Sequence, residues 1–191
     1  SHKELLDAAS EAVNILNSNE YEANVPAHIR EGIVEGYSEM VGPTTLAPLY
    51  IAMRFAREYA DTLYTGDGAD ELFIGYDSIV SLIDFIVSSG DESFASDLER
   101  ELSSRVFQAY DFRYPYMLGE ALHIGVKTPY LSPQVIEFAR RMPVDYKVRV
   151  EKGKTWGKWL LRKAFEDYLP PEIVWRKKTT IDSGTGAINL F

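Results

Sequence analysis

Apolar residues recur at helical spacing through most of this 191-residue chain, and only two short runs have the composition of strands. The two strand-like runs are 21–25 and 62–65, and helical segments separate them. Two short strands do not make an independently stable sheet. If they belong to a parallel α/β sheet, the middle of that sheet is not in this sequence. The helical pattern predicts helices over 5–16, 26–42, 48–59, 70–87, 92–109, 133–139 and 156–168, and leaves the aromatic stretch 111–125 unassigned.

Length and composition predict one ordinary globular domain over residues 1–191. Apolar residues make up 46% of the chain and charged residues 26%, which excludes wholesale disorder. No stretch approaches the ~20 apolar residues of a membrane span, so no membrane partner is expected. The absence of cysteine removes disulfides, thiol catalysis and thiolate metal sites. These features predict a soluble protein of the cytoplasm.

The charge is unevenly distributed. The net charge of −9 argues against a nucleic-acid partner, because phosphate is repelled over most of such a surface. Between Tyr146 and Lys178, however, ten Lys or Arg face four acids, a local net charge of +6. Such a segment fits a small polyanion such as a nucleotide, or it is a solvated basic face.

The densest candidate site is the run from Thr65 to Tyr76, with sequence TGDGADELFIGY. It predicts a strand that leads through a loop with two glycines into a helix, a geometry that presents backbone N–H groups to an anion. Three acids within five residues repel one another unless a cation shares the site, and Mg²⁺ held by one or two carboxylates and phosphate oxygens is the usual solution. Simple capping of the helix by Asp67 or Asp70 is the plainer alternative.

These residues resemble the synthetase domain of the glutamine-dependent asparagine synthetase family. The run 65–76 is similar to that family's Ser-Gly-Glu/Asp-Gly-Ser/Ala-Asp-Glu-Leu-Phe-Gly-Gly-Tyr motif. Further stretches agree with the family in the same order, and they are Pro48-Leu49-Tyr50, Thr128-Pro129-Tyr130-Leu131, Lys158-Trp159-Leu160-Leu161-Arg162 with Tyr168-Leu169-Pro170-Pro171, and Trp175-Arg176-Lys177-Lys178 with Asp182-Ser183-Gly184-Thr185-Gly186. Together the matches span residues 48–186, which resemble the C-terminal portion of the domain.

The resemblance implies a fold and an activity. The expected fold is predominantly α-helical as the sequence stands, an incomplete α/β domain of the adenine nucleotide α-hydrolase-like (ATP pyrophosphatase) type with few short parallel strands. The implied activity is that of an ATP-dependent, amide-forming ligase of asparagine biosynthesis. Such an enzyme adenylates aspartate with Mg-ATP and lets ammonia, free or derived from glutamine, displace AMP.

Site residues carry over one by one. The resemblance implies that Asp70 holds Mg²⁺ and that Asp67 handles the attacking ammonia. Lys158 and Lys178 match the lysines that neutralise the polyphosphate, so the catalytic set is Asp67, Lys158 and Lys178. The implied ATP-binding residues are Thr65, Gly66, Asp67, Gly68, Lys158 and Lys178.

The sequence also departs from the family. Its Ser-Gly-Gly-x-Asp-Ser phosphate loop does not occur in these 191 residues. We therefore expect weak ATP binding by the chain alone, and ligase activity only where that loop is supplied. The missing strands are expected from a further segment, a partner chain or a homo-oligomer. Gly125 and Ser132 depart from the family near the acyl acceptor, which leaves a β-lactam-synthetase-like amidating relative as one alternative; a non-catalytic remnant or partner subunit is another.

Overall fold

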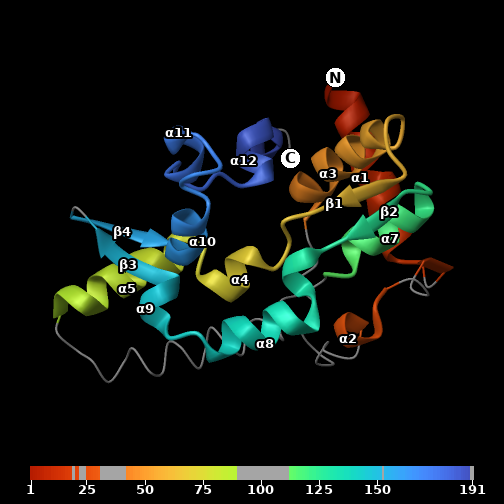
Figure 1. Cartoon of the computed structure of the whole chain (residues 1–191). Coiled ribbons are helices and arrows are strands. Elements are labelled where there is room, and N and C mark those ends of the chain that lie inside the picture. The colour runs from red at the N-terminus through yellow and green to blue at the C-terminus, as the bar shows by residue number, and fades with distance from the viewer. Residues whose placement is uncertain (19, 22–24, 31–41, 90–111, 152, 190–191) are drawn as a thin grey trace. The chain divides into compact units, whose positions relative to one another are not determined.

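A computed structural model describes residues 1–18, 20–21, 25–30, 42–89, 112–151 and 153–189 (Figure 1). The chain divides into two compact units. Unit 1 comprises Ser1–Thr65, Tyr110–Pro129 and Thr179–Phe191, and unit 2 comprises Gly66–Ala109 and Tyr130–Lys178. The single domain expected over residues 1–191 stays a prediction.

The described part of unit 1 contains helices and one pair of strands. Its elements are α1 (His2–Leu16), α2 (Ala27–Arg30), α3 (Pro43–Ala56), β1 (Thr62–Tyr64), α7 (Tyr114–Ala121), β2 (Gly125–Lys127), α12 (Ile181–Thr185) and the 3-10 helix η3 (Ala187–Asn189). Unit 2 contains α4 (Ala69–Phe73), α5 (Asp77–Ser89), α8 (Pro133–Arg141), α9 (Val144–Lys147), β3 (Val148–Glu151), β4 (Lys154–Gly157), α10 (Trp159–Ala164) and α11 (Pro171–Val174). The 3-10 helix η2 (Pro129–Leu131) begins in unit 1 and ends in unit 2.

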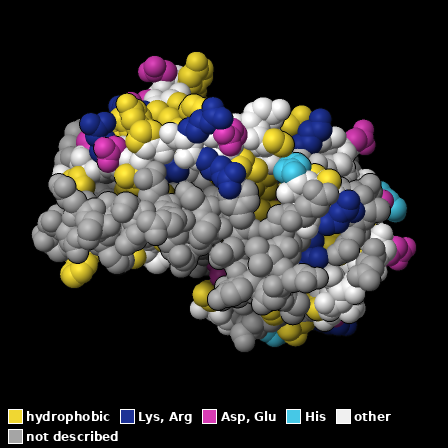
Figure 2. Space-filling view, turned by 90° about the horizontal axis from the view of Figure 1, so that it is seen from below, with side chains coloured by type: hydrophobic (Ala, Val, Ile, Leu, Met, Phe, Trp, Pro, Cys, Tyr) yellow, Lys and Arg dark blue, Asp and Glu magenta, His cyan; other side chains and the backbone are white. Residues whose placement is uncertain are grey.

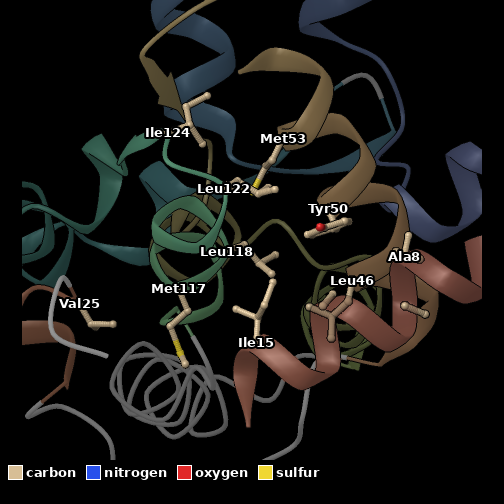
Figure 3. Packing of buried hydrophobic residues seen from close by; sticks show 13 residues of the cluster. Ala8, Ile15, Val25, Leu46, Tyr50, Met53, Met117, Leu118, Leu122 and Ile124 are labelled. Carbon is tan, nitrogen blue, oxygen red and sulfur yellow. The ribbon is translucent and has the colours of Figure 1, made fainter. Parts of the chain in front are cut away.

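The core of unit 1 is built where α1, α3 and α7 pack together (Figure 3). The close-up shows Ile15 of α1 and Leu118 of α7 pointing toward each other. Leu118 and Met53 are fully buried, and Ala12 gives α1 a side small enough for close helix packing. Burial of these apolar side chains is therefore the main source of stability in unit 1.

The strands of unit 1 correct part of the sequence-based prediction. β1 is confirmed within the predicted run 62–65, and it pairs in parallel with β2, with Leu63 opposite Val126. The missing strands were expected from outside these residues, but one partner of β1 lies within the chain, because the strand at Gly125–Lys127 had not been predicted. β2 is only three residues long and opens with glycine, so it lacks the periodic pattern of a strand. The other predicted strand, 21–25, is also wrong at its described ends, since Tyr21 lies in a helical turn and Val25 in a bend; residues 22–24 lie outside the described residues.

Unit 2 is organised around a β-hairpin. β3 and β4 are antiparallel, with Val148 opposite Gly157, and Gly153 at a φ of 73° lies in the turn between them. Ile74, Ile79, Ile83 and Val148 form a small apolar cluster beneath the hairpin, where β4 meets α5. The start of the helix predicted over 156–168 is wrong, because Trp156 lies in β4 and the helix α10 begins only at Trp159.

Other helix boundaries also differ from the prediction. The helix expected over 70–87 is broken into α4 and α5, because Ile74 adopts a left-handed conformation with a φ of 58°. The helix expected from Pro48 begins at Pro43, a residue whose fixed φ suits the first helical position, and Pro48 lies inside α3.

The remaining helix predictions have mixed outcomes. The helices predicted over 5–16 and 133–139 are confirmed by α1 and α8, and α7 occupies part of the unassigned stretch 111–125. Of the helix predicted over 26–42, α2 confirms a short part and residues 31–41 lie outside the described residues. The helix predicted over 92–109 lies wholly outside them.

The described residues are thus mostly helical with few short strands, as expected, and one strand pair is parallel. The assignment to the adenine nucleotide α-hydrolase-like fold stays a prediction. On the face shown in Figure 2, described acidic, basic and hydrophobic side chains are intermixed. Among the described helices, none combines the length and the hydropathy needed to cross a bilayer.

Candidate functional site

Three segments of unit 2 that are distant in sequence bring charged side chains together at Asp70. Asp70 lies in the first turn of α4, Lys158 precedes α10, and Lys178 follows α11. Lys158 Nζ is 2.8 Å from Asp70 Oδ1, and Lys178 Nζ is 3.6 Å from Asp70 Oδ2. The three side chains are between 21% and 25% exposed, so water screens their charges only in part. The structure therefore joins Asp70, Lys158 and Lys178 in one cluster, which we call the charged cluster.

The backbone around Asp70 is fixed by left-handed residues on both sides of α4. Gly68, with a φ of 89°, precedes the helix, and Ile74 ends it. A Cβ atom on Gly68 would lie 2.3 Å from Leu131 Cδ2, so only glycine allows η2 to pack this closely. The peptide N–H of Lys158 donates to the carbonyl oxygen of Phe73 at 2.9 Å, which attaches the start of α10 to the end of α4.

Two further glycines make room for the charged cluster. A Cβ on Gly75 would lie 1.7 Å from Asp70 Oδ1 and 2.2 Å from Lys158 Cε. A Cβ on Gly157 would lie 2.0 Å from the carbonyl oxygen of Ile74. The loop after α4 and the end of β4 approach each other this closely because neither position carries a side chain.

A tyrosine and a second carboxylate border the charged cluster. The Tyr76 hydroxyl donates a hydrogen bond to Glu71 Oε1, and the ammonium of Lys178 lies 5.7 Å from the centre of the Tyr76 ring. Burial raises the pKa of Glu71, and the nearby charges of Asp70 and Asp67 raise it further, against the lowering effect of the Tyr76 hydrogen bond. Burial and the charge of Glu71 also raise the pKa of Tyr76, so this hydroxyl remains a donor at neutral pH.

The charged cluster fits a metal-bound polyphosphate. Asp70 Oδ1 is buried and makes no well-aligned hydrogen bond to any described residue, although Lys158 Nζ lies close to it. This oxygen is a hard donor of the kind that Mg²⁺ prefers. No group of three or more His, Cys, Asp or Glu side chains suited to a metal gathers among the described residues. Mg²⁺ typically takes one or two carboxylates from the protein and further oxygens from phosphate, so Asp70 fits such a role.

The other predicted site residues are placed as follows. Asp67 lies half-buried in the turn before α4, close enough to Glu71 to affect the pKa of that residue. Gly66 is exposed in the same turn, and Gly68 is buried. Thr65 belongs to unit 1, where its peptide N–H extends the β1–β2 ladder by donating to Lys127 O at 2.9 Å. The nucleotide contacts of Thr65, Gly66, Asp67 and Gly68 stay predictions.

Comparison with known proteins now bears on this site. The family model described as "Asparagine synthase" matches residues 104–190, a range that includes Lys158 and Lys178 of the charged cluster. Curated asparagine synthetases align over larger parts of the chain. The chain is similar to the asparagine synthetases. The predicted resemblance to this family is confirmed.

The curated relatives are similar to the chain at modest identity. A glutamine-hydrolysing asparagine synthetase of Gallus gallus is 27% identical over 144 residues, which cover 73% of this chain and 24% of the relative. Asparagine synthetase 3 of Arabidopsis thaliana is 25% identical over 195 residues, covering 95% of this chain and 32% of the relative. A glutamine-hydrolysing asparagine synthetase of Triphysaria versicolor is 28% identical over 127 residues, which cover 64% of this chain and 20% of the relative. The chain thus spans between a fifth and a third of the length of the curated relatives it matches.

Sequence reasoning missed several residues of this site. Gly75 and Tyr76 lie inside the predicted motif, but the sequence did not show that Gly75 contacts the Asp70–Lys158 pair. Gly157 directly precedes Lys158, and a glycine next to a candidate lysine was the available signal. Glu71 was counted as one acid of three, and its partner Tyr76 became visible only in the structure.

Proposed function

We propose that this chain contributes the polyphosphate-binding part of an ATP-dependent, amide-forming ligase of the asparagine synthetase type. The observation that carries the proposal is the charged cluster, in which Lys158 and Lys178 converge on Asp70. Within the charged cluster two ammonium groups face one carboxylate, and the lysines attract a phosphate anion. Mg²⁺ bound with the phosphate would offset the neighbouring carboxylates Asp67 and Glu71. The relationship to asparagine synthetases supports the assignment of the anion as the polyphosphate of ATP.

The residues divide the work by their chemistry. Lys158 and Lys178 bind oxygens of the polyphosphate and balance the charge that grows as pyrophosphate departs. Asp70 orients both lysines and offers Oδ1 to Mg²⁺, which when bound neutralises further phosphate charge. Asp67, in the turn before α4, accepts a proton from the attacking ammonia. Thr65, Gly66 and Gly68 shape the loop that meets the nucleotide.

The substrates in this proposal are ATP, aspartate and ammonia, either free or derived from glutamine. Adenylation of the aspartate side chain releases pyrophosphate, and ammonia then displaces AMP to form asparagine. The family's Ser-Gly-Gly-x-Asp-Ser loop completes the phosphate cradle and comes from a further segment or from a partner chain. We place the reaction in the cytoplasm.

Protection of the two lysines from acetylation tests the proposal on the chain itself. We expect millimolar inorganic pyrophosphate to slow acetylation of Lys158 and Lys178, measured residue by residue by mass spectrometry, and Mg²⁺ to increase that protection. Lys177 is the internal control, because it is 81% exposed and lies 3.9 Å from Asp77 rather than in the charged cluster. Equal protection of all three lysines, or none, contradicts the proposal.

The variant Asp70→Asn separates a metal ligand from a carboxylate that only pairs with the two lysines. The N-cap residue of α4 is Gly68, and no side-chain capping bond is present, so the substitution removes no helix cap and the fold is expected to remain intact. If Asp70 holds Mg²⁺, the variant loses the Mg²⁺-dependent part of the protection while Lys158 and Lys178 still respond to pyrophosphate. An unchanged Mg²⁺ effect shows that Asp70 pairs with the two lysines and is not a ligand of Mg²⁺.

The reaction class is tested by product analysis with the phosphate loop present. The proposed ligase forms AMP, pyrophosphate and asparagine in equal amounts from Mg-ATP, aspartate and ammonia. Formation of a cyclic amide from another acyl acceptor favours the β-lactam-synthetase-like alternative. Pyrophosphate binding without any turnover favours a non-catalytic subunit.

A further inference from the structure

We propose that Arg162 is a positioning residue that holds Lys158 and Lys178 together at Asp70. The functional part of this inference rests on the proposed polyphosphate-binding role of the charged cluster. The structural part does not, because it concerns which side chain joins the two backbone segments that carry the lysines.

Arg162 lies in α10 and forms hydrogen bonds to three backbone carbonyls. Its Nε donates to Gly157 O at 2.9 Å. Its Nη1 donates to Val174 O and also to Arg176 O, the latter at 3.1 Å. The first acceptor directly precedes Lys158, and the last lies two residues before Lys178. One guanidinium therefore fixes both approaches to the charged cluster.

Aromatic rings hold the guanidinium in place. The Arg162 guanidinium carbon lies 5.1 Å from the centre of the Trp156 ring and 6.0 Å from that of Trp175, and the two rings meet edge to face at 5.0 Å. Cation–π contacts of this kind attract the guanidinium to the faces of the rings. Burial and the neighbouring Arg176 lower the pKa of Arg162, yet an arginine remains charged in proteins. In α11, Val174 is buried, so the acceptor segment is itself anchored.

Lysine cannot reproduce this arrangement. Arginine has five N–H donors in a fixed planar fork, whereas lysine carries a single ammonium group on a flexible stem. The ammonium of a lysine at position 162 cannot reach carbonyls on both segments with the same geometry. Arg162→Lys thus keeps the charge near the site and removes the connection between the segments.

The test compares Arg162→Lys with Arg149→Lys in the full chain. Arg149 is the matched control because its guanidinium also lies over a tryptophan, Trp159, at 4.6 Å, but it is exposed in β3 and outside the charged cluster. Acetylation rates of Lys158 and Lys178 and amide hydrogen exchange over 174–178 are measured for both variants without ligand. Affinity for Mg-pyrophosphate is measured by competition with acetylation.

We expect Arg162→Lys to accelerate acetylation of Lys178 roughly tenfold. The variant loses a hydrogen bond from a charged donor, and the segment that carries Lys178 is then less well ordered. Exchange over 174–178 rises, and pyrophosphate affinity falls by a similar factor. In Arg149→Lys all three readouts stay within twofold of the unsubstituted chain. A general loss of stability would instead change exchange throughout unit 2, including α8.

The outcomes separate the inference from the proposed function. If neither variant changes the lysine rates or the exchange over 174–178, Arg162 does not position the lysines and the inference is overturned. If the unsubstituted chain shows no protection by pyrophosphate but Arg162→Lys still releases Lys178, the positioning role stands and the proposed function is wrong. If Arg162→Lys and a second variant, Arg162→Gln, both fail to fold while Arg149→Lys folds, Arg162 is a general stability residue and the inference is overturned.

Discussion

The core of unit 1 and the charged cluster of unit 2 are held together in different ways. In unit 1, fully buried side chains such as Leu118 and Met53 fill the space between three helices. In unit 2, the loop after α4 and the end of β4 approach each other at Gly75 and Gly157, and the ion pair between Asp70 and Lys158 lies beside Gly75. The core of unit 1 depends on bulky side chains that fill the space between helices. The charged cluster depends on two glycines, whose lack of a side chain lets the segments approach each other.

This difference separates stability from function. Filling a core with apolar side chains supplies most of the free energy of folding. A partly exposed ion pair adds little net stability, because desolvation and side-chain ordering offset the attraction. Substitutions in the unit 1 core are therefore expected to lower stability, whereas substitutions at the charged cluster are expected to affect anion binding first.

Leu118→Ala is expected to have the largest effect on stability. Leu118 is 0% exposed within the core of unit 1, and removal of a buried leucine side chain leaves a cavity. We expect a loss of about 3 kcal/mol in the free energy of unfolding. Chemical denaturation measures this loss, and amide exchange in α7 assigns it to unit 1.

Leu6→Ala is the matched control for that variant, because Leu6 belongs to α1 of the same unit but is 41% exposed. Its effect is expected to stay below about 1 kcal/mol, since alanine is also a good helix former. Equal losses in the two variants contradict the view that volume in the core holds unit 1 together.

The sequence predicted the helix α1 of unit 1 well, but it did not predict how the segments of unit 2 are arranged. The regular spacing of Leu5, Ala9, Val13 and Leu16 was enough for α1, because a helix that packs on one face shows that face as a period. The strand β2 was missed because three residues carry no period. In unit 2, the left-handed Ile74 interrupts an apolar run that reads as one continuous helix.

The residues of the candidate site could be predicted from the sequence, but their positions relative to one another could not. The charges of Lys158, Lys178 and Asp70 were visible in the sequence, and the family motif selected them from the other charges. Their convergence depends on contacts between segments up to 108 positions apart, as in the pair of Lys178 with Asp70. Neither composition nor period specifies such contacts, so Gly75 and Arg162 could not be recognised from the sequence alone.

Gly157→Ala is expected to have the second-largest effect on stability. The added Cβ would lie 2.0 Å from the backbone oxygen of Ile74, so the loop after α4 must move. Overpacking of this kind costs about 1–3 kcal/mol. Denaturation measures the loss, and increased amide exchange at Lys158, whose N–H donates to Phe73 O, locates it.

Two other glycines sharpen this prediction. The atoms nearest to a Cβ at Gly75 belong to the movable side chains of Asp70 and Lys158, so we expect Gly75→Ala to cause a smaller loss of stability together with faster acetylation of Lys158. Gly42→Ala is the control, because among the described residues its Cβ would meet a single atom, Thr44 Oγ1, at an ordinary 3.8 Å. If Gly157→Ala proves as harmless as Gly42→Ala, the two segments do not depend on the missing side chain.

Glu71→Gln is expected to have the smallest effect, and its dependence on pH is the informative part. Burial, together with Asp70 and Asp67, raises the pKa of Glu71 in the folded chain, while the hydrogen bond from Tyr76 lowers it. A glutamine side chain keeps an oxygen for the Tyr76 hydroxyl and removes the charge. We therefore expect the variant to be slightly more stable than the unsubstituted chain at neutral pH, by less than about 1 kcal/mol.

The sign of the pH dependence follows from the raised pKa. Below the pKa of about 4.3 that glutamate has in unfolded chains, the carboxyl is protonated in both states and the variant gains nothing. As the pH rises from there through the folded-state pKa, the unfolded chain releases its proton first, so the unsubstituted protein loses stability and the advantage of Glu71→Gln grows. Urea denaturation between pH 4 and pH 8 measures this difference, with Glu172→Gln as the control because Glu172 is an exposed residue of α11. A variant that becomes less stable than the unsubstituted chain as the pH rises would show that the lysines beside Asp70 stabilise the charged form of Glu71, and would make Glu71 a further member of the charged cluster.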